Sequence, residues 1–194
     1  MRLLLDDSRI DVNVNFEARN PALRVALELW KSIEKREIFE MLVKSSRFDL
    51  NNVIENGQTI LHYAVMIKTE EYVEILLKEA VHGRLDVNKK DNKGWSATHV
   101  AFYFSMRNSR ELKDPFTLNE FSSLVELILK YQKEANIDLE IRDNDGQTPL
   151  HLLYQTRSKK NVEQFLKLAK NEYNIEFDVN AKDHKGNVPA DLSE

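Results

Sequence analysis

The stretch that decides the fold is "DNDGQTPLHLL", from Asp143 to Leu153. Gly146 is followed two residues later by Thr148, then by Pro149, and His151 lies five residues after the glycine. Threonine is a good N-cap, because its hydroxyl can accept a hydrogen bond from a backbone N–H of the first helical turn. Proline suits the next position, since the N–H that it lacks would have no partner inside the helix. The stretch therefore predicts a tight turn followed by a helix that begins at Pro149.

The same pattern recurs along the chain. A glycine is followed five residues later by histidine at Gly57–His62, Gly94–His99 and Gly146–His151, while Gly186 is followed by Asp191. An Asp-apolar-Asn or Asp-apolar-Glu step lies eight residues before each of these glycines, at Asp49, Asp86, Asp138 and Asp178. A further Asp-apolar-Asn pattern begins at Asp11, and Arg19 occupies the glycine position eight residues later. A fixed offset inside a variable period indicates a rigid turn unit that recurs between segments of variable length.

Two apolar segments lie between successive turn units. The second and clearer one reads "EYVEILLKEA" from Glu71, "LVELILKYQ" from Leu124 and "NVEQFLKLA" from Asn161. Apolar residues recur there at i, i+3 and i+4, which is typical of an amphipathic helix. Each repeat is therefore predicted to contain a turn, a helix, a loop and a second helix.

These residues resemble the ankyrin-repeat family. "DNDGQTPLHLL" matches the pattern Asp-x-x-Gly-x-Thr-Pro-Leu-His-x-Ala except at Leu153, and "NGQTILHYA" and "NKGWSATHVA" are close variants. "HKGNVPADL" is a more divergent copy. The resemblance covers nearly the whole chain. It implies an all-α solenoid of stacked helix-turn-helix pairs with β-hairpin-like loops, about four repeats plus partial end repeats, and an extended concave face.

We predict a single ankyrin-repeat domain over residues 1–194. Its divisions are 1–19 (partial repeat and loop), 20–56 (repeat 1), 57–93 (repeat 2), 94–145 (repeat 3, with an insertion at about 104–120), 146–185 (repeat 4) and 186–194 (partial C-terminal repeat). The insertion suits either a binding element or a tolerated loop. The two ends fall inside a repeat, which fits diverged capping repeats and a segment of a longer repeat protein equally well.

The repeated histidines are interpreted as structural. His62, His99 and His151 occupy equivalent positions, so neighbouring copies are about 10 Å apart in a stack of helices, too far to share a metal ion. The resemblance implies that each histidine bonds the preceding hydroxyl and the adjacent backbone. The predicted caps are Thr59, His62, Ser96, His99, Thr148 and His151. No metal site and no cofactor are predicted.

Composition and motif content narrow the classes of function that the chain can have. The net charge is -4, which argues against a general nucleic-acid surface. The chain has no cysteine, so thiolate chemistry is excluded, and no apolar run approaches the roughly 20 residues that span a bilayer. Neither a phosphate-binding glycine loop nor a recognisable catalytic frame is present. We predict a non-enzymatic protein in a reducing, cytoplasmic compartment. The long repeats also resemble those of intracellular bacteria and large viruses, which implies possible delivery into a host-cell cytosol.

The function predicted is protein–protein interaction on the concave face formed by the loop tips and the first helices. The resemblance places the partner-binding residues at Glu55, Asn56, Gln58, Met66, Ile67, Asn92, Lys93, Trp95, Tyr103, Phe104, Asn144, Asp145 and Gln147, with Gln155 at the matching position of the next repeat. Large apolar side chains in the middle repeats fit an interface centre. They also fit ordinary core if the insertion folds over them.

The expected partner is another protein, with no nucleic acid, membrane or small-molecule substrate. One alternative is a substrate-targeting or scaffold segment of a larger multidomain enzyme or secreted effector, whose activity lies outside this chain. A weaker alternative is an enzyme within the repeats, which would need a polar pocket with perturbed acids.

Overall fold

The computed structural model describes residues 33–104, 123–156 and 159–193. This part contains α-helices and one 3₁₀ helix and no β-strand, which confirms the predicted all-α repeat solenoid. The helices are α3 (Ile33–Lys44), α4 (Ile60–Met66), α5 (Glu70–Val81), α6 (Ala97–Phe104), α7 (Ser123–Tyr131), α8 (Pro149–Thr156), α9 (Lys159–Tyr173) and the 3₁₀ helix η3 (Pro189–Leu192). No helix within these ranges has the length and apolarity to cross a membrane.

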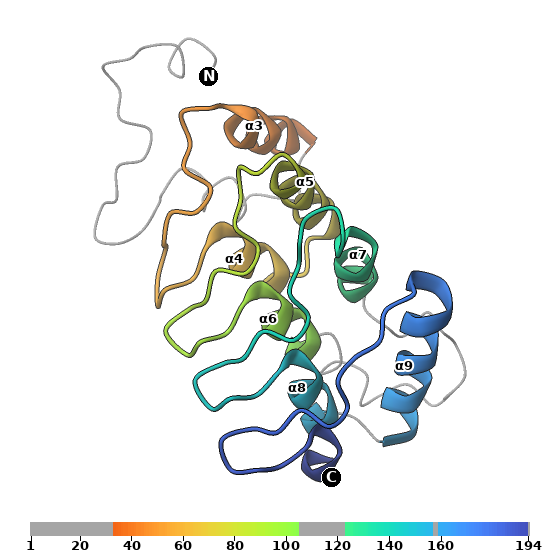
Figure 1. Cartoon of the computed structure of the whole chain (residues 1–194). Coiled ribbons are helices and arrows are strands. Elements are labelled where there is room, and N and C mark those ends of the chain that lie inside the picture. The colour runs from red at the N-terminus through yellow and green to blue at the C-terminus, as the bar shows by residue number, and fades with distance from the viewer. Residues whose placement is uncertain (1–32, 105–122, 157–158, 194) are drawn as a thin grey trace.

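The helices form two stacked layers (Figure 1). In the first layer α4 contacts α6, α6 contacts α8, and α8 contacts η3. In the second layer α3 contacts α5, α5 contacts α7, and α7 contacts α9. The first-layer helices α4, α6 and α8 also pack on the second-layer helices that follow them, α5, α7 and α9 respectively. The core is therefore built from nearest-neighbour contacts that repeat along the stack.

The second-layer helices follow the apolar spacing of the sequence. In α5 the buried apolar residues are Tyr72, Val73, Leu76, Leu77 and Ala80, which lie on one face of the helix. The remaining positions are mostly charged and outward-facing, apart from Glu79, which pairs with Arg84. The segments expected from Glu71, Leu124 and Asn161 are α5, α7 and α9, so periodicity located these helices to within a few residues.

Four connecting loops precede the first-layer helices and project to the same side of the stack (Figure 1). We call them loop 1 (residues 45–59), loop 2 (82–96), loop 3 (132–148) and loop 4 (174–188). One backbone hydrogen bond joins the tips of each adjacent pair. The bonds run from Asn92 N to Asn56 O (3.0 Å), from Asn144 N to Lys93 O (3.2 Å) and from His184 N to Asp145 O (2.9 Å). The loop tips thus form a continuous edge across the described repeats.

Glycine is required where these loops meet. Gly94 has a φ of 78°, and a Cβ built on it would lie 2.5 Å from the backbone nitrogen of Asn144 in loop 3. Gly57 is in the same position relative to loop 2, with a Cβ 2.7 Å from Asn92 N. The recurring glycine therefore serves two needs, a left-handed backbone conformation and space for the next loop.

Some elements expected from the sequence lie outside the described residues, and one has a different helix type. The first helix expected in repeat 1 and nearly all of the insertion at about 104–120 lie outside the described residues. The helix expected from "GNVPADLSE" is the 3₁₀ helix η3, which begins at Pro189. Its N–H bonds run to the third residue back, from Asp191 N to Val188 O (2.9 Å) and from Ser193 N to Ala190 O (3.4 Å). A 3₁₀ turn is a common form for so short a helix.

Candidate functional site

The histidine of each repeat links its own helix to the next loop. In the last complete copy, the Thr148 N–H donates to His151 Nδ1 at 3.1 Å, and the Thr148 hydroxyl lies 2.9 Å from the same nitrogen. His151 Nε2 lies 3.3 Å from the carbonyl oxygen of Asn187 in loop 4. Because Nδ1 accepts the backbone N–H, the ring proton belongs on Nε2, which donates to loop 4. The imidazole caps one helix and binds the following repeat.

The other two copies have the same geometry. His62 Nδ1 accepts the Thr59 N–H at 3.1 Å, and its Nε2 lies 2.9 Å from Trp95 O. His99 Nδ1 accepts the Ser96 N–H at 3.1 Å, and its Nε2 lies 3.1 Å from Gln147 O. The sequence suggested a hydroxyl cap at these helix starts, whereas the structure adds the ring nitrogen as the acceptor of the N-cap N–H.

These histidines are neutral scaffold groups. All three are buried, and burial lowers the pKa of each imidazole, only partly offset by the bond to the next loop's carbonyl. Both ring nitrogens are already engaged, so none has a nitrogen left for a substrate or a metal. Within the described ranges, no group of three or more His, Asp or Glu side chains could hold a metal ion.

An aspartate organises each of loops 2, 3 and 4. Asp143 Oδ1 accepts the backbone N–H groups of Asp145 (2.9 Å) and Gln147 (2.8 Å), and its own N–H donates to Gln147 O at 2.9 Å. Asp91 and Asp183 play the same part in loops 2 and 4. Asp143 is the first residue of the motif quoted from the sequence, but sequence reasoning gave it no role. An aspartate three residues before Gly94, Gly146 and Gly186 is the signal that would have identified the three loop organisers.

Asp143 also holds a side chain of the previous repeat. The indole Nε1–H of Trp95 donates to Asp143 Oδ2 at 3.1 Å. The Trp95 ring packs on Tyr103 with centroids 5.1 Å apart and an interplanar angle of 57°, and Lys93 Nζ lies 5.4 Å from the Trp95 centroid. Trp95 is half-buried, and this arrangement fixes the direction of its ring.

Trp95 and Tyr103 occupy a pair of positions that is used in each repeat. The first position follows the glycine directly, and the second lies at the end of the first-layer helix. In the next repeat the same pair is Gln147 and Gln155, joined by a hydrogen bond of 3.0 Å from Gln155 Nε2 to Gln147 Oε1. In the previous repeat it is Gln58 and Met66, and Met66 is 36% exposed. We call these six residues the side-chain row: Gln58, Met66, Trp95, Tyr103, Gln147 and Gln155.

The structure places the thirteen sequence-predicted binding residues in two groups. The exposed ones are Glu55, Asn56, Met66, Asn92, Lys93, Asn144 and Asp145; the half-buried ones are Gln58, Ile67, Trp95, Tyr103, Phe104 and Gln147. The loop tips among them are brought together by the backbone bonds described above. Ile67, Trp95 and Phe104 pack partly against the core, so these three divide their surface between scaffold and solvent.

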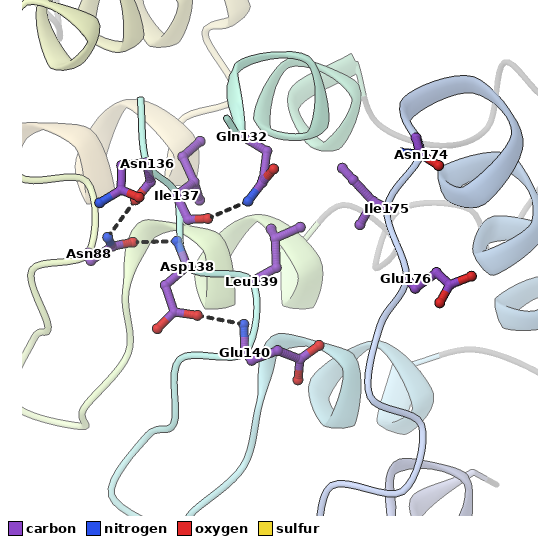
Figure 2. Close-up of a pocket in the computed structure, with 10 residues that line it drawn as sticks. All are labelled: Asn88, Gln132, Asn136, Ile137, Asp138, Leu139, Glu140, Asn174, Ile175 and Glu176. Carbon is purple, nitrogen blue, oxygen red and sulfur yellow. Dashed lines mark hydrogen bonds between the residues drawn. The ribbon is translucent and has the colours of Figure 1, made fainter. Parts of the chain in front are cut away.

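A groove lies between loops 3 and 4 (Figure 2). This groove has a volume of about 640 Å³ and is lined by residues of loops 2, 3 and 4, including Asp138, Glu140 and Glu176. Its lining includes asparagine, glutamine and acidic side chains but no histidine, serine or lysine. The Asp138 carboxylate already accepts the Glu140 N–H at 2.9 Å. The Glu140 carboxyl, whose pKa is raised by burial, accepts the Asp178 N–H at 3.0 Å, and Glu176 pairs with Lys170 at 2.7 Å. The groove is therefore a polar hollow with one perturbed acid, and each of its three acidic side chains is engaged by a neighbouring residue.

Comparison with known proteins agrees with this architecture. Residues 23–112 match the family model for ankyrin repeats in three copies. Over 112 residues the chain is 30% identical to Rabankyrin-5 of Mus musculus. That match covers 58% of this chain and 8% of the mouse protein, so the similarity concerns a small part of a much longer protein.

Proposed function

Because this chain is an ankyrin-repeat protein, we propose that it binds a partner protein through the side-chain row and the tips of loops 1 to 3. Ankyrin repeats are generally protein–protein interaction modules. The row takes one residue from the end of each loop and one from the C-terminal end of the first-layer helix that follows it, so one partner can contact three successive repeats.

The observation that carries the proposal is the contact between Trp95 and Tyr103. Their rings lie 5.1 Å apart at positions that carry glutamines in the next repeat, and both remain half-exposed. Aromatic side chains are enriched at interface centres and at the few positions that carry most of the binding free energy. The exposed loop-tip residues Asn56, Asn92, Lys93, Asn144 and Asp145 supply the polar rim that such a centre requires.

The surface is organised before a partner arrives. The Trp95 indole is held by Asp143, the Gln147 and Gln155 amides are held by each other, and the loops are joined tip to tip. Groups that are already fixed lose little conformational entropy on binding, so more of the contact energy contributes to affinity.

We also propose that the role is non-enzymatic. The three buried histidines have both ring nitrogens engaged in helix caps and inter-repeat bonds. The acidic side chains of the 640 Å³ groove are engaged by their neighbours, since Asp138 and Glu140 accept backbone N–H groups and Glu176 pairs with Lys170. These features support a scaffold in which ionisable groups hold the repeats together.

A second candidate is a targeting segment of a larger protein. The observation that favours it is the match to 8% of a longer mouse protein. In that case the side-chain row still binds a partner, and the activity of the whole protein is carried by other regions.

The proposal is tested by affinity capture from lysate with three forms of the chain. These are the wild type, the double variant Trp95→Ala/Tyr103→Ala and the control Tyr173→Ala, which truncates a half-buried tyrosine of α9 in the second layer. Proteins that are enriched by the wild type and the control, but lost by the double variant, support the side-chain row. Equal enrichment by all three forms, with unchanged helicity, would remove this assignment.

A further inference from the structure

A ladder of asparagine side chains joins the bases of successive loops. Asn51 in loop 1 uses both ends of its amide across the junction to loop 2. Its Oδ1 accepts the Asp86 N–H at 2.7 Å, and its Nδ2 donates to the carbonyl oxygen of Arg84 at 3.2 Å. One side chain thus provides two hydrogen bonds of opposite direction between neighbouring repeats.

The next junction repeats this arrangement (Figure 2). Asn88 in loop 2 accepts the Asp138 N–H at 2.9 Å and donates to the carbonyl oxygen of Asn136, also at 2.9 Å. The two backbone partners are again two residues apart. The amide fits because it carries an acceptor and a donor at the same time.

Glutamate replaces asparagine at the third junction. Glu140 in loop 3 accepts the Asp178 N–H of loop 4 through Oε1 at 3.0 Å, as the asparagines do at their junctions. The carbonyl that corresponds to those of Arg84 and Asn136 is that of Glu176, two residues before Asp178. An ionised carboxylate has no proton to donate, so it can form only the first of the two bonds.

The surroundings of Glu140 favour its neutral form. Burial is the largest cause that raises the pKa of this carboxyl, and the charges of Asp178 and Asp138 raise it further. The bond from the Asp178 N–H and the Arg142 guanidinium act in the opposite direction. Arg142 donates to the carbonyl oxygens of Gly146 (2.7 Å) and Lys182 (2.6 Å), while Glu176, which also lines the groove, pairs with Lys170 at 2.7 Å.

We propose that Glu140 is a proton-dependent latch between loops 3 and 4, forming one hydrogen bond to loop 4 when ionised and two when protonated. In the protonated form the new O–H donates to the carbonyl oxygen of Glu176, which restores the two-bond link made by Asn51 and Asn88. The step requires only the uptake of one proton from solvent by the Glu140 carboxylate.

The direction of the pH dependence follows from linkage. The folded state binds the Glu140 proton more tightly than the unfolded state, so this group adds stability as pH falls through its folded pKa and removes it as pH rises. The junction between loops 3 and 4 is therefore tightest in acid and loosest at neutral pH. The latch strengthens the attachment of loop 4, which the His184 N–Asp145 O bond and the Arg142 bond to Lys182 O hold in both protonation states.

Two variants separate the donor from the charge. Glu140→Gln is nearly isosteric, neutral, and carries both an acceptor and a permanent donor, whereas Glu140→Met is neutral with no donor and no comparable acceptor, so it also removes the bond from the Asp178 N–H. Glu176→Gln is the control, because Glu176 lies in the same groove but is exposed and paired with Lys170. The urea midpoint of the full chain is measured at several pH values for each form. The hydrogen-exchange rate of the Asp178 backbone amide is measured at the same pH values and corrected for the intrinsic pH dependence of exchange.

Glu140→Gln is expected to raise the urea midpoint at neutral pH and to slow exchange of the Asp178 amide by roughly two- to tenfold, the factor that one net hydrogen bond provides. The difference in urea midpoint between Glu140→Gln and wild type should shrink as acid protonates the wild-type carboxyl. At neutral pH, Glu140→Met should raise the midpoint less than Glu140→Gln does, and Glu176→Gln should not raise it. The three buried histidines are common to all forms, so their titration cancels in the differences. A constant difference between Glu140→Gln and wild type at every pH, or an equal gain from methionine, would overturn the proposal.

Discussion

The indole nitrogen of Trp95 donates a hydrogen bond to the carboxylate of Asp143, 3.1 Å away and 48 positions further along the chain. Asp143 simultaneously organises loop 3 through its other carboxylate oxygen. The same residue therefore shapes one repeat and orients the most prominent aromatic side chain of the repeat before it. Surface geometry and scaffold stability are coupled at this junction.

Replacing Asp143 by asparagine should separate its two roles, the orientation of Trp95 and the organisation of loop 3. One oxygen remains to accept the Asp145 and Gln147 N–H groups, but the amide nitrogen that replaces the other oxygen cannot accept the indole proton. We expect a loss of about 1.5–3 kcal/mol in the free energy of unfolding, typical of a lost hydrogen bond to a charged group. Urea unfolding measures the loss. Emission from Trp95, recorded in a Trp30→Phe background, should shift as the ring is released, and identical emission would contradict the bond.

The close approach of loops 2 and 3 is tested at two glycines. Gly94 and Gly83 both have positive φ values, of 78° and 74°, but only at Gly94 would a Cβ meet a neighbour, Asn144 N at 2.5 Å. Gly83→Ala should cost about 1 kcal/mol from backbone strain alone. Gly94→Ala adds overpacking and should cost about 1–3 kcal/mol more. Thermal or urea unfolding of the two variants measures the difference, and equal losses would show that the loops do not need this space.

The histidines predict a fall in stability in mild acid. Burial lowers the pKa of His62, His99 and His151 in the folded chain, so the unfolded state takes up protons first as pH drops below about 6.5. The stability is complete above that pH and is lost as pH falls towards the folded pKa values. Urea midpoints should therefore decrease between about pH 7.5 and about pH 5.5.

His99→Asn is the matching variant. It should lower the free energy of unfolding at neutral pH by about 1–3 kcal/mol, because buried groups of Ser96 and Gln147 lose their partner. It should also flatten the pH dependence, since one titrating group is removed. An unchanged slope in this range would mean that the ring is not held neutral in the folded state.

The parts of the structure that the sequence predicts are local ones. The turn at Gly146, the helix that begins at Pro149 and the second-layer helices depend on residues within a few positions of one another, and all are found as expected. The exception is the final copy, where a 3₁₀ helix replaces the predicted helix.

The contacts between repeats could not be predicted in the same way. Trp95 meets Asp143 and Glu140 meets Asp178 because the stack sets loops of different repeats side by side, and the spacing between them is not encoded in any one pattern. The replacement of asparagine by Glu140 is visible in the sequence as "DLE" among "DLN" and "DVN". Its consequence becomes clear only when the two-bond geometry of Asn51 and Asn88 is known.

The central claim is that the side-chain row binds the partner. The most direct measurement is the dissociation constant of a purified captured partner for the wild type, Trp95→Ala/Tyr103→Ala and Tyr173→Ala. We expect the double variant to bind at least about 100-fold more weakly, because central aromatic residues contribute about 2 kcal/mol or more each at interfaces and their effects do not add fully. The α9 control should retain wild-type affinity. A double variant that keeps its helicity and binds as tightly as the wild type would contradict the account.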